Sequence, residues 1–426
     1  MSSVPTKEGL QTTETITNSA DGEHAIEANG ETASYSNVAV KKTGSSNSGD
    51  EADFYGDNAS VFATNGATLN LSEVVVESDG THTNGVFSYG EGTTVNVVDS
   101  VIETAGNCSG GLMTTGGATM NASNLRIATS GNSSAAIRSD RGGGTVNVDK
   151  GVYTTSGTGS PVIYSTADIT VSNAEMESTA SQGVVVEGKN SVTLNDVQLV
   201  ANNNTKNSDK SSFYQAVMIY QSMSGDAANG EASFTMNGGS LTNANGDIFF
   251  VNNTVATINL AGATITNNDA NGVFLRAAAA GWGSEGSNGG QVIMNASGQT
   301  IDGDMVVDGV SLLNLYLKDG SAFTGAINAS GAAGNVYVEL TGGSTWTLTS
   351  DSYVTSLTCD AGAINLNGHT LYVNGEAYDG TSASAGQAIE IVVSESKGGP
   401  GGNGGTPPDG KGSSGSGGTP PSKPNN

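Results

Sequence analysis

The chain has 426 residues, and its 15 Lys and Arg against 41 Asp and Glu give a formal net charge of −26 at pH 7. A chain this acidic lacks the basic surface that nucleic-acid binding requires, so we exclude that class of function. Gly fills 62 positions, only 35% of residues are hydrophobic, and no run of about 20 apolar residues occurs, which excludes a helical bundle and a membrane-spanning helix.

Residues 1–22 are polar and rich in Ser and Thr, and we expect them to form a leader and an N-terminal cap. No apolar segment typical of a signal peptide follows Met1, which leaves a cytoplasmic protein or a mature fragment with an added start methionine. The low Cys and Lys contents and the abundant Gly, Asn and Thr favour the second alternative. We therefore expect a secreted protein, or one displayed on a bacterial or archaeal cell surface.

A short pattern, Thr–apolar–Asn, recurs along residues 23–290, once with Ser in the last place. Its occurrences are spaced by 26, 25, 26, 25, 23, 42 and 22 positions, which indicates one repeating unit of roughly 22–26 residues. The spacing of 42 equals one unit plus an insertion, which we place around residues 202–231. The pattern starts at Thr68, Thr94, Thr119, Thr145, Thr170, Thr193, Thr235 and Thr257.

Each unit holds three short alternating segments separated by Gly, Asn or Asp, such as residues 94–97, 101–104 and 112–115. Such alternation between turn residues is typical of strands. Three strands per unit, without any helical segment, predict an all-β fold: a right-handed single-stranded parallel β-helix with three-strand coils. The central apolar residues of the pattern should form one interior column, with Thr and Asn outward. These are Leu69, Val95, Met120, Val146, Val171, Leu194, Met236 and Ile258.

The last third of the chain divides in two. Residues 291–396 keep strand character with a looser rhythm, and we predict C-terminal coils and a cap there. Residues 397–426 are dominated by Gly, Pro and Ser, a composition that cannot bury apolar surface and predicts a disordered linker or tail.

Residues 344–349 alternate around Trp346 and Leu348, and residues 352–354 and Leu357 follow. This succession is similar to the end of pertactin-like autotransporter passengers. The chain resembles, over about residues 25–395, the extracellular adhesin-like β-helix proteins of the pectin-lyase-like solenoid group. The resemblance implies a surface-displayed, often adhesive and non-enzymatic rod, with host or microbial surface glycans or proteins as partners. Because a Gly/Pro-rich tail follows the motif, self-transport through an outer membrane is not implied.

Aligned third strands of successive units place unusual polar residues along one edge. Arg and Lys engage carboxylates, and Tyr rings offer faces on which sugars stack. The edge is therefore a candidate glycan-binding groove, made of Tyr89, Arg138, Asp140, Arg141, Tyr164, Glu187, Lys189 and Tyr220. A further candidate is Trp282, in a Gly-rich loop after four alanines, which equally suits the filling of a gap beside the insertion.

Three alternatives stay open for this edge and its surroundings. The same residues fit outward ion pairs and a tyrosine stack that only stabilise neighbouring coils. The resemblance also implies a polysaccharide lyase that uses Arg138, Asp140 and Lys189. The outward Thr–x–Asn array suits an ice-binding solenoid, although such residues more often satisfy turns and neighbouring coils.

We nevertheless predict no catalytic residues and no enzyme activity. None of the three histidines, His24, His82 and His369, stands in the Gly-His-Gly of the related hydrolases. Residues 246–250 are only faintly similar to the Asp-Phe-Ile-Phe strand of the related esterases, and a buried strand explains them better.

The sequence predicts no metal site and no cofactor. Cys108 and Cys359 are far apart and form no CxxC motif, and whether they pair is left open. Calcium is the one cation to consider, because the chain is acidic. Asp302, Asp304 and Asp308 are the first place to look for it.

Overall fold

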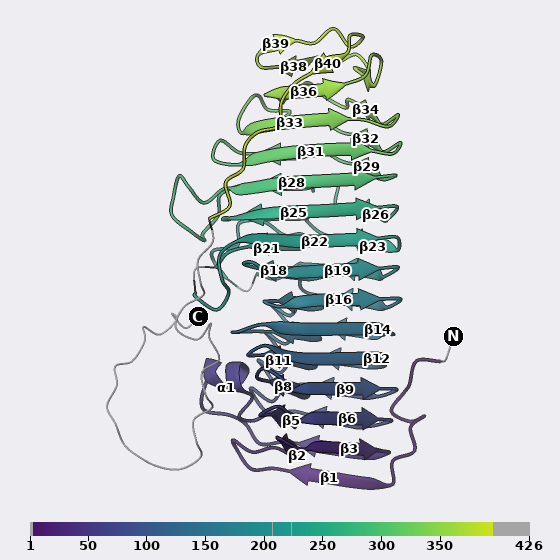
Figure 1. The fold of residues 1–426 in the computed structure, drawn as a ribbon, viewed down its shortest axis with the longest axis vertical. Coiled ribbons are helices and arrows are strands. Elements are labelled where there is room, and N and C mark those ends of the chain that lie inside the picture. The colour runs from purple at the N-terminus through teal and green to yellow at the C-terminus, as the bar shows by residue number, and fades with distance from the viewer. Residues whose placement is uncertain (1–2, 207, 223, 395–426) are drawn as a thin grey trace.

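The computed structural model describes residues 3–206, 208–222 and 224–394, and almost all of their secondary structure is parallel β-strand. The strands stack one above another along the long axis of the molecule (Figure 1). They form four sheets of 22, 11, 4 and 3 strands. This repeat-like arrangement of parallel strands is consistent with a β-helix-like solenoid, as the sequence repeat predicts.

The 11-stranded sheet forms one face and carries the candidate groove. Its members are β2 (Ile26–Asn29), β5 (Val61–Thr64), β8 (Val86–Tyr89), β11 (Leu112–Thr115), β13 (Ile137–Ser139), β15 (Ile163–Ser165), β18 (Val184–Glu187), β21 (Gln215–Tyr220), β24 (Asp247–Asn252), β27 (Leu275–Ala277) and β30 (Met305–Val307).

The 22-stranded sheet consists of two parallel ladders and one added strand. One ladder contains β3 (Thr32–Ser36), β6 (Thr68–Ser72), β9 (Thr94–Val98), β12 (Ala118–Thr129), β14 (Gly144–Thr155), β16 (Asp168–Ser172), β19 (Ser191–Asn195), β22 (Glu231–Asn237), β25 (Thr254–Ala261), β28 (Gly290–Ser297), β31 (Leu312–Lys318), β33 (Asn335–Leu340) and β36 (Ser356–Cys359). The other contains β1 (Glu14–Asn18), β4 (Val38–Lys42), β7 (Val75–Ser78), β10 (Val101–Thr104), β17 (Glu175–Ser178), β20 (Gln198–Ala201), β23 (Ser240–Asn243) and β26 (Thr264–Asn267). The ladders are joined because the long strands β12 and β14 belong to both.

The remaining strands lie toward the C-terminal end. The 4-stranded sheet contains β29 (Thr300–Asp302), β32 (Ala322–Thr324), β34 (Thr345–Thr347) and β37 (Ile364–Asn365). The 3-stranded sheet contains β35 (Ser352–Val354), β38 (Leu371–Val373) and β39 (Glu376–Ala377). The added strand β40 (Ser384–Ala385) pairs antiparallel with β36, and β39 pairs antiparallel with β38, so the parallel stacking ends here.

The interior column predicted from the Thr–apolar–Asn pattern is partly wrong in register. All eight of its residues are buried, but Val146 pairs with Ile169 rather than with Val171. Ile258 returns to the predicted column, because its partner is Phe234. Three residues lie instead in the neighbouring interior column: Val171, Leu194 and Met236. A shift of two residues keeps every side chain on its own face, so the sequence pattern does not distinguish the two registers.

The prediction that no helical segment interrupts the strands is also wrong. A short helix, α1 (Asp50–Tyr55), follows β4 and lies beside the coils that contain β8 and β11 (Figure 1). Acidic residues fill its first turn, where the helix dipole favours negative charge. Gly56 ends the helix in a left-handed conformation, φ 75°, and donates its N–H to the Ala52 carbonyl. Six residues are too few to show a helical period in sequence.

Of the two predicted terminal segments, the structure describes only the N-terminal one. At the N-terminus, β1 pairs with β4 in the stack, and residues 5–7 contact side chains of β7, β10 and β12. Lys7 contacts Glu77 there, and Arg126 Nε donates to the Pro5 carbonyl at 2.9 Å. The predicted tail, residues 397–426, lies outside the described residues.

Candidate functional site

The outward side of the 11-stranded sheet carries most of the polar residues selected from the sequence. Inward and outward residues alternate: Ile137 and Ile163 belong to the interior core, while Arg138 and Tyr164 face out. Parallel pairing aligns the outward residues into a column. The column reads Phe62, Phe87, Met113, Arg138, Tyr164, Val185, Met218, Phe250 and Arg276.

Both ends of this outward column are covered by other segments. Helix α1 covers the N-terminal end, where the Thr115 hydroxyl donates to the Phe54 carbonyl at 2.7 Å. Phe213, which precedes β21, covers the other end, and its ring packs against Phe250 at 5.3 Å between centroids. Trp282, from the connection that follows β27, packs edge-on against Tyr220.

Between these covers the sheet surface is hollowed into two adjoining cavities. The first, of about 330 Å³, we call the arginine pocket; Asp53, Cys108, Arg138, Asp140, Tyr164 and Asp226 line it. The second, of about 570 Å³, we call the tyrosine pocket; Tyr164, Glu187, Lys210, Tyr220, Asp226 and Trp282 are among its lining residues. Tyr164 and Asp226 belong to both linings, so the pockets form one continuous cleft.

In the arginine pocket, Arg138 lies between two carboxylates. Its Nη2 donates to Asp53 Oδ2 at 3.2 Å and to Asp140 Oδ2 at 3.1 Å. Its Nη1 is buried and has no hydrogen-bond partner among the residues described. Burial opposes the charge of Arg138, but Asp53 and Asp140 outweigh it and raise its pKa, so the guanidinium stays cationic.

The two carboxylates of the arginine pocket differ in protonation. Burial raises the pKa of Asp140 to about 7, since the charges of Asp226, Asp53 and Glu187 add to burial and outweigh the attraction of Arg138. Burial also acts on Asp53, but there Arg138 and His82 outweigh it and hold the pKa below its ordinary value. Asp140 is therefore the group of this pair that exchanges a proton near neutral pH.

The tyrosine pocket is organised around Glu187, which is 2% exposed. Its carboxylate accepts hydrogen bonds from the hydroxyls of Tyr164 and Ser222, and from Tyr220 at 3.2 Å. Burial, with the charge of Glu187, raises the pKa of both phenols well above its ordinary value, so both stay protonated donors. The pocket thus places a buried carboxyl group beside aromatic rings.

The structure brings most of the sequence candidates into this cleft, but not all. Arg138, Asp140, Tyr164, Glu187, Tyr220 and Trp282 line it. Arg141 borders it, with its guanidinium over the Phe54 ring and bonded to Asp226. Tyr89 is buried against Tyr55 under α1, outside both linings. Lys189 is exposed and also lies outside both linings.

Sequence reasoning missed four residues of the cleft region: Asp53, His82, Cys108 and Asp226. Asp53 comes from the unpredicted helix, and Asp226 from the insertion. His82 Nδ1 lies 3.2 Å from Asp53 Oδ2. The one available signal was that His82 and Cys108 are separated by one repeat and occupy the same turn in consecutive units.

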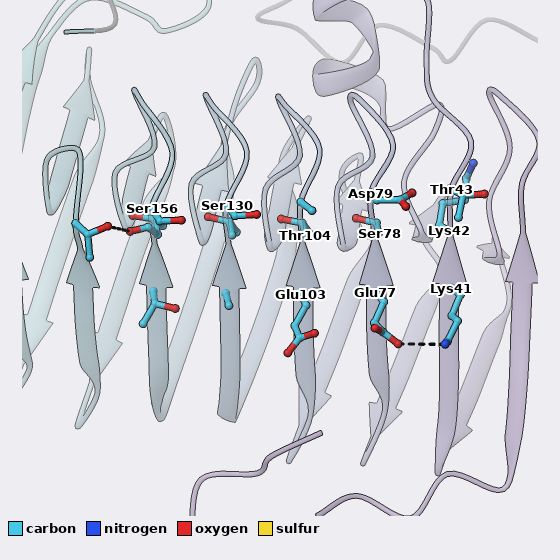
Figure 2. Close-up of a pocket in the computed structure, with 16 residues that line it drawn as sticks. Lys41, Lys42, Thr43, Glu77, Ser78, Asp79, Glu103, Thr104, Ser130 and Ser156 are labelled. Carbon is cyan, nitrogen blue, oxygen red and sulfur yellow. Dashed lines mark hydrogen bonds and ion pairs between the residues drawn. The ribbon is translucent and has the colours of Figure 1, made fainter. Parts of the chain in front are cut away.

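A third hollow, of about 550 Å³, lies on another face, over the ladder that contains β4, β7 and β10 (Figure 2). Both of its lysines are already paired within the fold. Lys41 lies 3.6 Å from Glu77, as Figure 2 shows, and Lys42 is buried and donates to the Ala20 carbonyl. Since no aromatic ring lines it, we rank it below the cleft as a candidate site.

Two of the three carboxylates suggested for calcium accept hydrogen bonds from neighbouring segments. Asp304 accepts hydrogen bonds from the Ala326 N–H and the Thr349 hydroxyl. Asp308 accepts from the Ala279 and Val310 N–H groups. Within the described residues, Asp302, Asp304 and Asp308 do not converge as a ligand group.

Two further sequence features have structural roles. Residues 247–250 belong to the buried strand β24, as expected, and its Asp247 pairs with Arg276 Nε at 2.6 Å. Cys108 and Cys359 form no disulfide with each other.

The outward asparagines of the Thr–x–Asn array bond to the next coil. Three consecutive amides donate to the amide oxygen of the preceding rung: Asn96 to Asn70 at 2.9 Å, Asn121 to Asn96 at 2.9 Å and Asn147 to Asn121 at 3.0 Å. One donor of each amide is therefore used within the ladder rather than presented to a surrounding lattice.

No protein-family model matches the chain, and neither the curated proteins nor the solved structures contain a significant match. Among the residues described, no helix has the length and apolar character needed to cross a bilayer.

Proposed function

We infer that this protein is a non-catalytic, adhesin-like module that binds surface glycans in the tyrosine pocket. One observation supports this most: the buried Glu187 carboxylate lies among Tyr164, Tyr220 and Trp282 in a cavity of about 570 Å³. Sugars carry hydroxyl donors that suit a carboxylate and apolar ring faces that suit aromatic side chains. The volume falls in the range of roughly 300–1,000 Å³ that small-ligand pockets occupy.

The proposal includes the architecture and its location. We take the stack to be a right-handed single-stranded parallel β-helix, because crossovers between parallel strands are right-handed in about 98% of cases. An elongated, acidic stack suits display outside the cell, at the surface or in secreted form. Its expected partners are host or microbial glycans or proteins.

A glycan array followed by titration calorimetry tests the proposal. Trp282→Ala and Lys210→Ala remove side chains that line the pocket without touching the interior core. Each should weaken binding of the best glycan at least about 10-fold, equivalent to about 1.4 kcal/mol. Lys189→Ala is the matched control, an exposed lysine outside the lining, and should bind as the wild type does. Absence of array signal, or equal affinity for all three variants, contradicts the proposal.

A polysaccharide lyase is the second candidate, favoured by Asp140. A carboxyl whose pKa is about 7 suits a group that gives and takes protons at neutral pH. Against it, Lys189 lies outside the cleft and Arg138 is held by two carboxylates. Incubation with polygalacturonate decides between the two: an ultraviolet-absorbing unsaturated product, lost in Asp140→Asn, would establish the lyase and overturn the non-catalytic proposal.

A further inference from the structure

Three metal-ligating side chains converge beside the arginine pocket. An oxygen of Asp53, a ring nitrogen of His82 and the sulfur of Cys108 all lie within 4.8 Å of one another. In the described parts of the chain, no other three His, Cys, Asp or Glu side chains do so. We propose that these three residues bind a divalent transition-metal ion, zinc or one of similar preference.

The repeat itself brings the imidazole and the thiol together. His82 and Cys108 occupy the same turn in consecutive coils, each in a left-handed conformation with φ 55°. The His82 N–H donates to the Asn107 carbonyl at 2.9 Å, and the Cys108 N–H donates to Asn132 at 2.8 Å. Equal backbone conformation on rungs about 4.8 Å apart makes the two side chains project in the same direction. The third ligand comes from α1, which packs over these coils.

The donor set selects the kind of metal. A thiolate, an imidazole and a carboxylate are zinc ligands, whereas calcium and magnesium require a shell of oxygens. In a tetrahedral site with ligand bonds of about 2.0 Å, neighbouring nitrogen and oxygen ligands lie roughly 3.3 Å apart. Asp53 Oδ2 and His82 Nδ1 are 3.2 Å apart, which fits that spacing.

The fourth coordination position of the ion would face the arginine pocket. Asp53 and Cys108 both line the arginine pocket, so a water molecule or a ligand atom there reaches the ion from the cleft. Three protein ligands with one open position are the arrangement of catalytic rather than structural zinc sites. The ion would also link α1 to the two turns that carry His82 and Cys108.

The neighbouring Arg138 cation opposes a metal ion, but its contacts limit the cost. It is also bonded to Asp140, which holds it at 3.1 Å independently of Asp53. The other oxygen of Asp53 accepts from Asn84 Nδ2 at 3.3 Å, which orients the carboxylate. The ion displaces the thiol proton of Cys108, and the resulting thiolate offsets one of its two positive charges.

Titration of the chelator-treated full chain with Co²⁺ tests the site. Sulfur-to-cobalt charge transfer should appear in the near ultraviolet, saturate at one ion per chain, and disappear when Zn²⁺ is added. Cys108→Ser should abolish the band. His82→Asn should weaken cobalt binding at least about 10-fold, because replacing even a hydrogen-bond partner of a metal ligand costs about 10- to 100-fold in affinity. Cys359→Ser, the matched control at the far end of the stack, should behave as the wild type does.

A measurement on the wild-type protein tests the site without relying on a variant that could fail to fold. Zn²⁺ should slow alkylation of Cys108 by iodoacetamide at least about 10-fold, because a coordinated thiolate is shielded. Mass spectrometry of the digested protein locates the modified cysteine. Equal alkylation rates with and without zinc, no cobalt band in the wild type, or a band that survives in a folded Cys108→Ser variant would each overturn the proposal.

Discussion

Arg141 and Asp226 are 85 positions apart in sequence and are joined by two hydrogen bonds. Asp226 Oδ1 accepts from Arg141 Nε at 3.2 Å and from Nη2 at 2.8 Å. The same guanidinium carbon lies 3.8 Å from the centroid of the Phe54 ring, on α1. One side chain therefore joins the two segments that border the cleft, and it fixes the distance between them.

Replacing Arg141 by Gln should loosen both borders of the cleft. Asp226 is 12% exposed and would lose its cationic partner, so we expect the free energy of unfolding to fall by about 1–3 kcal/mol. Urea titration followed by circular dichroism measures the change. Asp226→Asn in the same chain should restore part of the loss, because no unpaired charge is then buried. A loss below about 0.5 kcal/mol, the scatter of surface changes, would count against this bridging role.

The asparagine ladder makes a second, independent prediction. Asn121 both donates to Asn96 and accepts from Asn147, so Asn121→Ala breaks two rung-to-rung hydrogen bonds. At about 0.5–1.5 kcal/mol for each bond, we expect a loss of roughly 1–3 kcal/mol in unfolding free energy. Asn147→Ala breaks the one bond that Asn147 donates to Asn121, so it should cost about half as much. Equal losses for the two variants would mean that the amide bonds are not the source of stability.

The repeat carries enough information to predict stacked parallel strands, and that prediction is confirmed. Period-two alternation with turn residues places each side chain in or out, and every central residue of the Thr–apolar–Asn pattern is buried. Register is harder to predict, because Val148 and Val171 pair although they occupy different places in the pattern. Both are apolar residues on the same face, and only the lengths of the intervening turns distinguish the two alignments.

The cleft is less predictable, because its parts come from segments outside the repeat. Tyr164, Glu187 and Tyr220 lie on successive coils, and the pairing of β15, β18 and β21 places them there. Asp53 and Asp226 were not predicted, because each belongs to a connection whose path depends on tertiary contacts. A single sequence shows that such a connection is long, but not which coil it folds against.

Asp140 predicts how stability depends on pH. Its pKa is about 7 in the folded protein, above the ordinary value of 3.8, so the folded state holds this proton more tightly than the unfolded chain. Its contribution to stability is therefore fully present below about pH 4 and is lost as the pH rises through about 7. Asp140→Asn removes this loss, so the variant should gain stability relative to the wild type across that range. Urea unfolding at constant ionic strength measures the difference, and parallel profiles for the two proteins would refute the assignment.

Trp346 anchors the C-terminal coils, and its replacement should be among the most costly in the chain. It is fully buried, stacks on Phe323 with ring centroids 5.4 Å apart, and donates Nε1 to the Gly325 carbonyl at 2.9 Å. Trp346→Ala should cost about 3–5 kcal/mol of unfolding free energy through the cavity it leaves. Trp346→Phe keeps the stacked ring and loses the hydrogen bond, so we expect about 1–3 kcal/mol.

Urea titration of both Trp346 variants measures these losses. Trp282→Phe is the control, because Trp282 belongs to a partly exposed loop rather than to the interior core, and it should change stability by less than about 1 kcal/mol. Removing so large a buried side chain should cost both its transfer free energy and the free energy of the cavity it leaves. If Trp346→Ala lowered the free energy of unfolding no more than this control does, the C-terminal coils would not depend on the buried indole.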